Sequence, residues 1–576
     1  MRSSRRVIGG FLLGSALLAV GHLLTTAIAD GRLAAASGFA TSAEARRSLD
    51  VLLRFGTGLT MTLTMGVSLL AIRRSIVAVV VPRQLGNLLI GEAVPGGLVT
   101  LVALTVSLVA GLGAAALPTD LLTVQFALRP LITGAVDPYL GRDLGFYWGW
   151  LPFERWLLGR SSLIWSVVTA VTVMAYASTS SIRLGIGGAW IAPFARRHLG
   201  LLLGVGILLL GWAWRIERFD LLVTATAPFG LTAHRLLAPA DRLFAWAAWP
   251  LAAMFIVASW RGDAILAAVS ALLVAGTGPV AGLLLPMLAD RRLLPAEYAS
   301  RDASYRRATA IYTAGQIDDS SRVAIASQPE GATEPGSPRD VLIASGAGPY
   351  AVIRDPAIRA VGARFDGLLD RIVFAWALRS PGLVGHDGDA GTRLVAPRDP
   401  IDRVRAIAPF AVAVSAPRWI EGDPAGPRWA IDLAVASMHY PMVVPIDWRG
   451  EETRYLRWAG VAYVDASSGA VVFAWSSSPD PILRRWREIV PEPFEGAMAL
   501  SPDEAVLWRG VTEATVIDSA GRRRDGPAGD RDGAAARDAA LRSVFEALVA
   551  ARRRGDWRAA LEAEARLARL IGRGGT

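Results

Sequence analysis

The chain has 576 residues, 53% hydrophobic and 19% charged, with 60 basic residues against 50 acidic ones and a formal net charge of +10. This composition is too apolar for a purely water-soluble protein, and the basic residues, all of them Arg, are spread along the chain in a way that favours Arg-flanked membrane helices over nucleic-acid binding. The absence of Cys excludes disulfides, thiolate metal sites and Cys nucleophiles, and the absence of Lys excludes a Walker A phosphate loop and a Schiff-base lysine.

Seven apolar segments are long enough to cross the roughly 30 Å hydrocarbon core of a bilayer. They lie near residues 7–28, 51–72, 97–117, 157–178, 197–214, 243–260 and 264–288. The first ends at a small-residue pattern, so a cleaved signal peptide that leaves six spans is the alternative. These segments make 1–292 the membrane domain. The basic N-terminus favours a cytoplasmic start, and seven spans from there put the rest of the chain outside the cytoplasm.

The loop 118–156 is predicted to lie along the outer membrane interface, with a short interfacial helix at 119–133. Its aromatic residues are of the kind found where a bilayer meets water, namely Phe146, Tyr147, Trp148, Trp150 and Phe153. Tyr147 and Trp148 are also candidate binding residues. Asp137 and Asp143 are candidate catalytic acids or bases for a lipid-linked substrate, although no basic phosphate clamp accompanies them and a membrane anchor is the simpler interpretation.

After the last span the composition becomes that of a water-soluble region. We expect a membrane-exit helix and linker at 293–340, a mixed α/β domain at 341–519, and a linker with a C-terminal helical hairpin at 520–576. Strands are predicted at 341–345, 350–354, 410–415, 428–435, 441–446, 455–465 and 470–476, and helices at 356–379 and 481–489. The segment 455–476 is predicted to be a β-hairpin because a polar, Gly-containing turn, Asp465 to Gly469, separates two alternating apolar runs.

Other motifs favour structural roles. The sequence His386-Asp387-Gly388-Asp389 lacks the regularly spaced oxygens and closing Glu of a calcium loop, so we expect neither a metal ion nor a cofactor. His439 and Ser437 lack the nucleophile elbow and acid of a catalytic triad. In the last span, Pro279 and Pro286 are typical of a kinked helix, with a broken transporter helix as the alternative.

Several segments together resemble the bacterial uncharacterised protein family 0182. They include VDPYLGRDLGFYWGWLPFERWLLG (136–159), LLPAEYASRDASYRRATAIY (293–312), RWAIDLAVASMHYP (428–441) and RYLRWAGVAYVDASSGAVVFAW (454–475). The resemblance implies seven transmembrane helices with the N-terminus inside and a large extracytoplasmic domain, and it implies no biochemical activity. Asp432 and Arg457 match the family pattern and are candidate binding residues. The segment AVAVSAPRWI (411–420), which follows Ala408-Pro409-Phe410, replaces a segment that is acidic in the family. The chain also looks shortened and divergent relative to the family.

These observations predict a multi-pass cell-membrane protein that is non-enzymatic and binds an envelope component or organises a complex through its extracytoplasmic domain. The expected partners are the lipid bilayer and envelope proteins or polymers, and not nucleic acid; the oligomeric state stays open. The alternatives are an enzyme acting on a lipid-linked substrate and a transporter that uses the last span. We also expect Arg301, Arg306 and Arg307 to bind ligand or pair with the acids of 134–153, which would make 134–153 and 293–312 a collar below the domain.

Overall fold

The computed structural model describes residues 14, 21–22, 24–287 and 342–497 of the chain. Gaps within these ranges lie at 79–83, 86–87, 90–95, 135, 138, 180, 186–187, 224–235, 286, 345–347, 355–361, 387–390, 415, 421–425, 442–445, 449–450 and 476–479. Most of the predicted first span, the predicted membrane-exit helix with Arg301, Arg306 and Arg307, and the predicted C-terminal hairpin lie outside the described residues.

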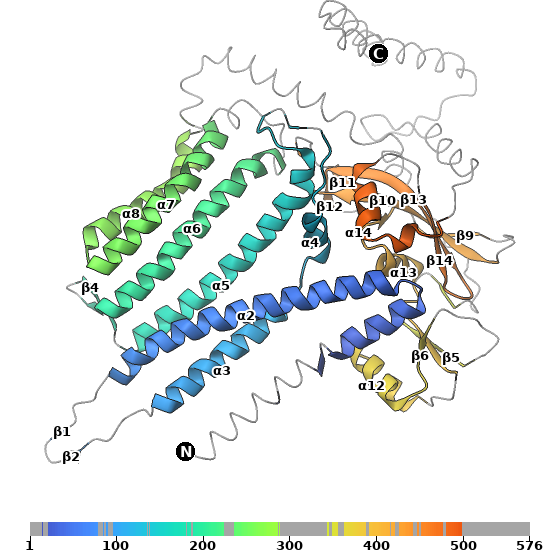
Figure 1. The fold of residues 1–576 in the computed structure, drawn as a ribbon, viewed down its shortest axis with the longest axis horizontal. Coiled ribbons are helices and arrows are strands. Elements are labelled where there is room, and N and C mark those ends of the chain that lie inside the picture. Colours follow the sequence, from blue (N-terminus) through green and yellow to red (C-terminus); the bar gives the residue numbers. More distant parts are fainter. Residues whose placement is uncertain are drawn as a thin grey trace, which may run out of the picture. The chain divides into compact units, whose positions relative to one another are not determined.

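Six long helices form the first half of the described chain (Figure 1). They are α2 (Ala40–Ala78), α3 (Gly96–Ala115), α5 (Leu151–Ser178), α6 (Pro193–Val223), α7 (Ala238–Arg261) and α8 (Ala264–Pro279). Two of them are lengthened by π-helical turns, since η1 (Phe146–Trp150) leads into α5 and η3 (Val280–Leu284) continues α8. All six are long and apolar enough to cross a membrane, so six of the seven predicted spans are present as candidate membrane helices, as expected of a membrane-embedded protein.

Small residues let these helices approach closely. A Cβ atom on Gly211 of α6 would lie 2.3 Å from the Cβ of Ala248 on α7, and one on Gly200 would lie 2.2 Å from the Cβ of Ser259. At the α2–α3 contact, a Cβ on Gly58 would lie 2.9 Å from the carbonyl oxygen of Gly111. At these contacts α6–α7 and α2–α3 therefore approach closely because Gly residues leave room for the neighbouring helix.

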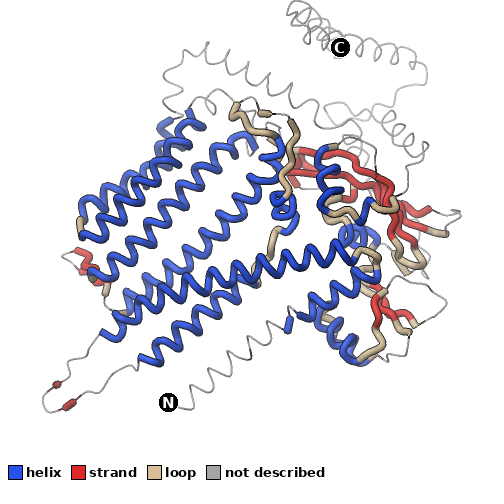
Figure 2. Tube along the Cα trace, viewed as in Figure 1, coloured by secondary structure: helices blue, strands red, loops and turns tan. Residues whose placement is uncertain are grey.

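The second part of the described chain is a mixed α/β region, which contains most of the strands drawn red in Figure 2. Its main sheet is antiparallel, with strand order β14-β13-β10-β8 and with β9 also paired to β10. The strands are β8 (Val412–Ala413), β9 (Arg418–Ile420), β10 (Arg428–Ser437), β13 (Tyr455–Asp465) and β14 (Val471–Trp475). A separate hairpin joins β11 (Ile446–Trp448) to β12 (Glu451–Thr453).

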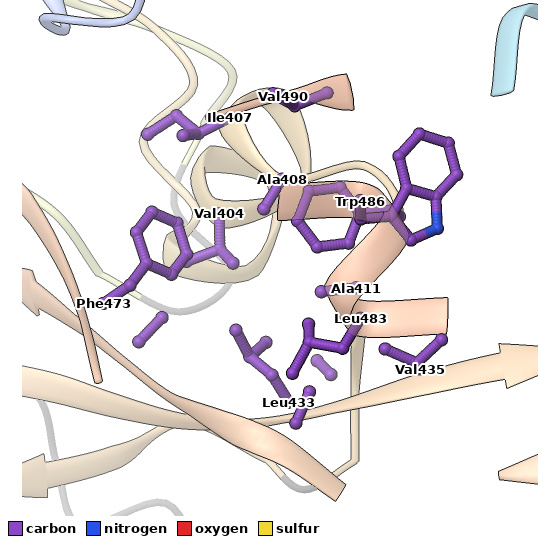
Figure 3. Close-up of a cluster of buried hydrophobic side chains, with 14 of the residues drawn as sticks. Val404, Ile407, Ala408, Ala411, Leu433, Val435, Phe473, Leu483, Trp486 and Val490 are labelled. Carbon is purple, nitrogen blue, oxygen red and sulfur yellow. The ribbon is translucent and has the colours of Figure 1, made fainter. Parts of the chain in front are cut away.

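Helices α13 (Pro400–Ile407) and α14 (Pro481–Ile489) contribute to the core on one face of this sheet (Figure 3). The predicted helix at 481–489 is confirmed residue for residue: Asp480 caps it by accepting a hydrogen bond from the Leu483 N–H at 2.8 Å. Leu483 and Trp486 of α14 lie against Leu433 and Val435 of β10 in this core.

A smaller sheet of order β5-β7-β6 packs with α12 (Leu368–Ala377). Its strands are β5 (Ala351–Ile353), β6 (Ala363–Arg364) and β7 (Arg393–Val395). The predicted helix at 356–379 is thus too long, because β6 precedes α12, and β7 is not among the predicted strands. Both errors have one cause: strands of two or three residues are too short to show an apolar period.

The predicted hairpin at 455–476 is confirmed. β13 and β14 pair antiparallel from Gly460–Trp475 to Val464–Val471, and the Gly469 N–H donates to the Asp465 carbonyl at 2.9 Å. The Asp465 carboxylate accepts hydrogen bonds from Ser467 and Ser468; although burial alone raises its pKa, these bonds prevail and lower it. Gly469 has φ +77°, a value that residues with a Cβ adopt only with strain.

Replacing Gly469 with Val should therefore destabilise the α/β region. A β-branched side chain opposes positive φ, and a Cβ at this position would lie 3.0 Å from the guanidinium carbon of Arg403. We expect a loss of about 1–3 kcal/mol in the free energy of unfolding, measured by thermal or denaturant unfolding of the detergent-solubilised protein. Gly348→Val, at a position with open space around the built Cβ, is the control. An unchanged midpoint for Gly469→Val would show that the turn tolerates a side chain.

Candidate functional site

Asp137 is buried at 1% exposure, and both its carboxylate oxygens accept hydrogen bonds from its own loop. The donors are the N–H groups of Tyr139 at 3.0 Å, Leu140 at 2.5 Å and Arg142 at 2.7 Å, and the hydroxyl of Tyr147 at 2.9 Å. A carboxylate that accepts this many hydrogen bonds holds a loop in shape. The first catalytic candidate is thus a structural centre of the loop.

Asp143 has a similar environment. Its oxygens accept from the N–H and hydroxyl of Thr133, each at 3.1 Å, from the Gly134 N–H at 2.9 Å and from the Gly145 N–H at 2.8 Å. The backbone of Asp143 also forms an isolated β-bridge with Val136. The two acids therefore close the loop 133–147 from both sides and set the direction in which the following π-helical turn leaves it.

Tyr147 and Trp148 lie in that turn and point to different parts of the protein. Tyr147 is fully buried with Phe219 and Leu222 of α6. Trp148, 8% exposed, packs in the α/β core, with its ring centroid 5.2 Å from that of Tyr440 and 5.3 Å from that of Tyr455. The expectation that all the loop aromatics lie at the membrane surface is wrong for these two, because both are buried in protein.

The core of the α/β region thus includes residues from the membrane half of the chain. Phe126 of α4 (Leu121–Leu128) packs on Trp486 with ring centroids 5.5 Å apart, and Leu131 and Leu144 belong to the same buried cluster. The membrane helices and the α/β region lie within one compact unit, Met1–Val506. We call the surface formed by Phe126, Leu131, Leu144, Trp148 and their partners in the α/β region the junction.

Polar contacts surround the junction. Glu492 accepts hydrogen bonds from the N–H groups of Thr41 and Ser42, each at 3.0 Å, and from the Ser42 hydroxyl at 2.6 Å, so it caps the start of α2. Burial alone raises the pKa of Glu492, but these hydrogen bonds outweigh burial and lower its pKa. Arg485 donates to the Pro130 carbonyl at 2.9 Å, and Arg129 donates to the Glu488 carbonyl.

Two ion pairs join α5 to α6 near the junction. Arg215 pairs with Glu154, and Arg155 pairs with Asp220. Glu154 and Asp220 are each only 7% exposed. The sequence did not point to these residues because the predicted spans begin at 157 and end at 214, whereas α5 begins earlier, at Leu151, and α6 ends later, at Val223. The signal that identifies them is the run RIERFD (215–220), which alternates charge directly after an apolar segment.

His439 is not part of a catalytic pair with Ser437. The hydrogen bond between them runs from the His439 backbone N–H to the Ser437 hydroxyl oxygen at 3.1 Å, which is a turn interaction. Burial lowers the pKa of His439 to about 4, and the nearby Arg155 and Arg454 add to this effect while Asp120 opposes it. The imidazole is therefore neutral at pH 7 and lies close to the ion pairs of α5.

Asp432 and Arg457, the binding candidates in the sheet, lie on neighbouring strands. The buried carboxylate of Asp432 on β10 has the Arg418 guanidinium 3.4 Å away. Arg457 lies on β13 opposite Val435, and its side chain is outside the described part of the chain. Within the described residues, no group of three or more His, Asp or Glu side chains is arranged to hold a metal ion.

An apolar cavity of about 230 Å³ lies between α2, α3 and α5. It is lined by Thr57, Met61, Ala110, Gly113, Ala114, Leu117, Arg160, Leu163, Ile164 and Val167. Arg160 is its one charged lining residue, and its guanidinium donates to the Pro118 carbonyl and lies over the ring of Trp156. A cavity of this lining suits a hydrocarbon chain rather than a polar substrate.

Comparison with known proteins identifies similar chains. The model of the Uncharacterised protein family (UPF0182) matches residues 8–315 and 360–505. A UPF0182 protein of Frankia alni is 36% identical over 86 residues, which cover 15% of this chain and 8% of that protein. UPF0182 proteins of Geobacter sp. and Geotalea uraniireducens are 34% and 31% identical over 148 and 144 residues, in each case 25% of this chain and 16% of the relative. These alignments thus span a small part of the relatives' length. No solved structure matches the chain.

Because Asp137 shapes the loop that carries Trp148, Asp137→Asn should destabilise the protein. The amide keeps one acceptor oxygen and turns an NH2 group toward N–H donors, and a buried donor left unsatisfied costs about 1–3 kcal/mol. We expect a lower unfolding midpoint in detergent. Asp402→Asn on the surface of α13, where the side chain is 56% exposed, is the control and should leave the midpoint unchanged. A stable Asp137→Asn protein would contradict the structural role and restore Asp137 as a catalytic candidate.

Proposed function

Because the chain belongs to the uncharacterised protein family UPF0182, whose name assigns no activity, we propose a function from the structure: the protein is a non-enzymatic membrane component that binds another envelope component or organises an envelope complex. Its α/β region presents the binding surface, and its helices hold that region at a fixed position on the membrane.

The junction is the observation that carries this proposal. Trp148 from the membrane half completes the aromatic cluster of Tyr440 and Tyr455, whose own rings are stacked 5.4 Å apart. The hydrophobic core of a domain attached only by a linker would consist of residues of that domain alone. A shared core instead supports a fixed platform, because truncating a buried Trp costs about 3–5 kcal/mol. A fixed platform suits a protein that positions a partner relative to the bilayer.

The alternatives have less support from the geometry. In the enzyme hypothesis, Asp137 and Asp143 supply the acid or base, but the oxygens of both carboxylates accept hydrogen bonds from the loop that carries them. In the transporter hypothesis, the last span is broken at Pro279, but the helix continues through Pro279 into the π-helical turn η3. In addition, only 6% of the most apolar stretch of that helix is buried within the protein, as expected for a helix at the periphery of the bundle.

We further propose that the α/β region lies outside the cytoplasm, with seven spans if 7–28 crosses the membrane. The start of α2 contacts Glu492 of the α/β region, so this end of the bundle is the domain side. In the sequence, the short connections from α2 to α3, from α5 to α6 and from α7 to α8 carry or adjoin Arg residues, namely Arg73, Arg74, Arg83, Arg183, Arg196, Arg197 and Arg261. Short loops rich in Arg favour the cytoplasmic side, which supports an extracytoplasmic α/β region.

Reporter fusions test this topology. Alkaline phosphatase fused after Arg292 should be active, because it folds only outside the cytoplasm, and the same enzyme fused after Arg83 should be inactive. Green fluorescent protein at the two positions should give the opposite pattern. An inactive phosphatase after Arg292 together with an active one after Arg83 would reverse the proposed orientation, while leaving the binding function to be tested separately.

The binding function is tested by loosening the junction. We expect the tagged full-length protein, isolated from native membranes in mild detergent, to have a larger mass than the chain and to carry a defined envelope component. Trp148→Ala should lose that component while the helices stay in the membrane, since the platform is no longer fixed. Trp190→Ala, at an exposed position (54%) on β4 (Gly188–Ile191), is the matched control and should retain it. If all three proteins run at the mass of the chain alone, the proposal is wrong.

A further inference from the structure

Helix α12 carries an apolar face that points away from its own core. Leu368, Leu369, Ile372 and Trp376 follow one another at helical spacing and are 58%, 75%, 41% and 44% exposed. The opposite face is buried, with Phe374 and Ala375 in the core below. A contiguous apolar patch on a helix in a largely polar region indicates a surface that something covers.

Contacts of residues 24–36, which are helical, fix the height of α12 relative to the membrane helices. This helix runs against α2: a Cβ on Gly31 would lie 2.6 Å from a guanidinium nitrogen of Arg47, and the charges of Arg47 and Asp50 act on Asp30. The chain reverses direction between the two helices, so positions equally far from the Gly31–Arg47 contact lie at about the same level along them. Residue 22, nine positions before Gly31, is thus level with about residue 56, nine positions after Arg47. His22 is therefore level with the first turns of the apolar part of α2.

At that level the exposed surface of α2 is already lipid-facing in character. Val51, Leu52 and Phe55 are 55%, 64% and 64% exposed. On the neighbouring helix, Leu24 and Ile28 are also exposed, at 56% and 43%. Exposed large apolar residues on two adjacent helices at one height mark the edge of the hydrocarbon.

Two contacts attach α12 to this edge. The Trp376 indole N–H donates to Nδ1 of His22 at 3.1 Å, and Asp370 pairs with Arg32. Trp376, beside His22, thus lies one to two turns inside the apolar part of α2, and the start of α12 lies farther out, beside Arg32. Ten helical residues span about 15 Å, so α12 runs from just inside the hydrocarbon edge outward through the headgroup layer.

We propose that α12 is a membrane-surface helix, whose Leu368, Leu369, Ile372 and Trp376 face insert into the leaflet on the domain side. The partner is the bilayer itself, because the patch continues the lipid-facing surface of α2 and residues 24–28. Trp376 has the position and chemistry of an interfacial indole, with its ring in apolar surroundings and its N–H hydrogen-bonded. This inference is independent of the proposed binding function and of which side of the membrane the α/β region occupies.

Site-directed spin labelling of the full-length chain tests the proposal directly, because the chain has no native Cys. Nitroxide labels are placed at Leu369→Cys and Ile372→Cys, and the protein is reconstituted into vesicles of phosphatidylcholine and phosphatidylglycerol. Leu272→Cys on α8, 74% exposed, is the lipid control. Arg405→Cys on α13, with a side chain 66% exposed, is the water control. The measurement is collision of each label with oxygen, which concentrates in lipid, and with a nickel chelate, which stays in water.

We expect the ratio of oxygen to nickel accessibility at Ile372 to exceed that at Arg405 several-fold and to stay below that at Leu272, which lies in the middle of a span. Leu369, farther from the hydrocarbon edge, should give an intermediate ratio. If both labels behave like the one at Arg405, the face is in water and the proposal is wrong. If both are shielded from oxygen and from nickel alike, a protein surface, either a partner or a second copy of the chain, covers α12, which equally overturns it.

Discussion

Trp148 occupies a position that neither half of the protein can fill alone. Its ring packs among aromatic residues of the α/β core, while its backbone belongs to the π-helical turn that leads into α5. The adjacent Tyr147 is buried against α6, so the peptide bond between these two residues connects the packing of both halves. Any movement of the α/β region relative to α5 would have to expose one of these two large rings to water, which makes the junction the constraint on which the remaining contacts depend.

The two loop carboxylates serve this constraint. Asp137 accepts a hydrogen bond from the Tyr147 hydroxyl as well as from its own loop, so the fold of the loop and the orientation of Tyr147 are fixed by one group. Asp143 binds the backbone of Thr133, Gly134 and Gly145, which joins the end of α4 to the start of the π-helical turn. Buried carboxylates with this many donors act through local backbone geometry, which explains why the loop carries these acids without a phosphate-binding clamp.

Sequence patterns predicted the elements that depend on local chemistry and failed where tertiary contacts decide. Six long apolar helices, the hairpin turn at Gly469 and the helix capped by Asp480 each follow from hydropathy, turn residues or caps, and each is present. The burial of Trp148 was not predictable, because an aromatic residue at a membrane boundary and one in a protein core look the same in sequence. Likewise, Glu154 and Asp220 were missed because hydropathy marks only the lipid-facing length of a helix and not its continuation into protein.

Three separate attachments hold the α/β region, and their separation matters more than the strength of any one. The junction at Trp148 acts on α5, Glu492 acts on the start of α2, and Asp370 of α12 acts on Arg32. Contacts from three different elements, unlike a single contact, restrain rotation as well as translation of a body. A region restrained in this way loses little further freedom when it binds, so more of its contact energy remains as affinity. The proposed binding of a partner at a defined height and orientation on the membrane would therefore draw on this packing.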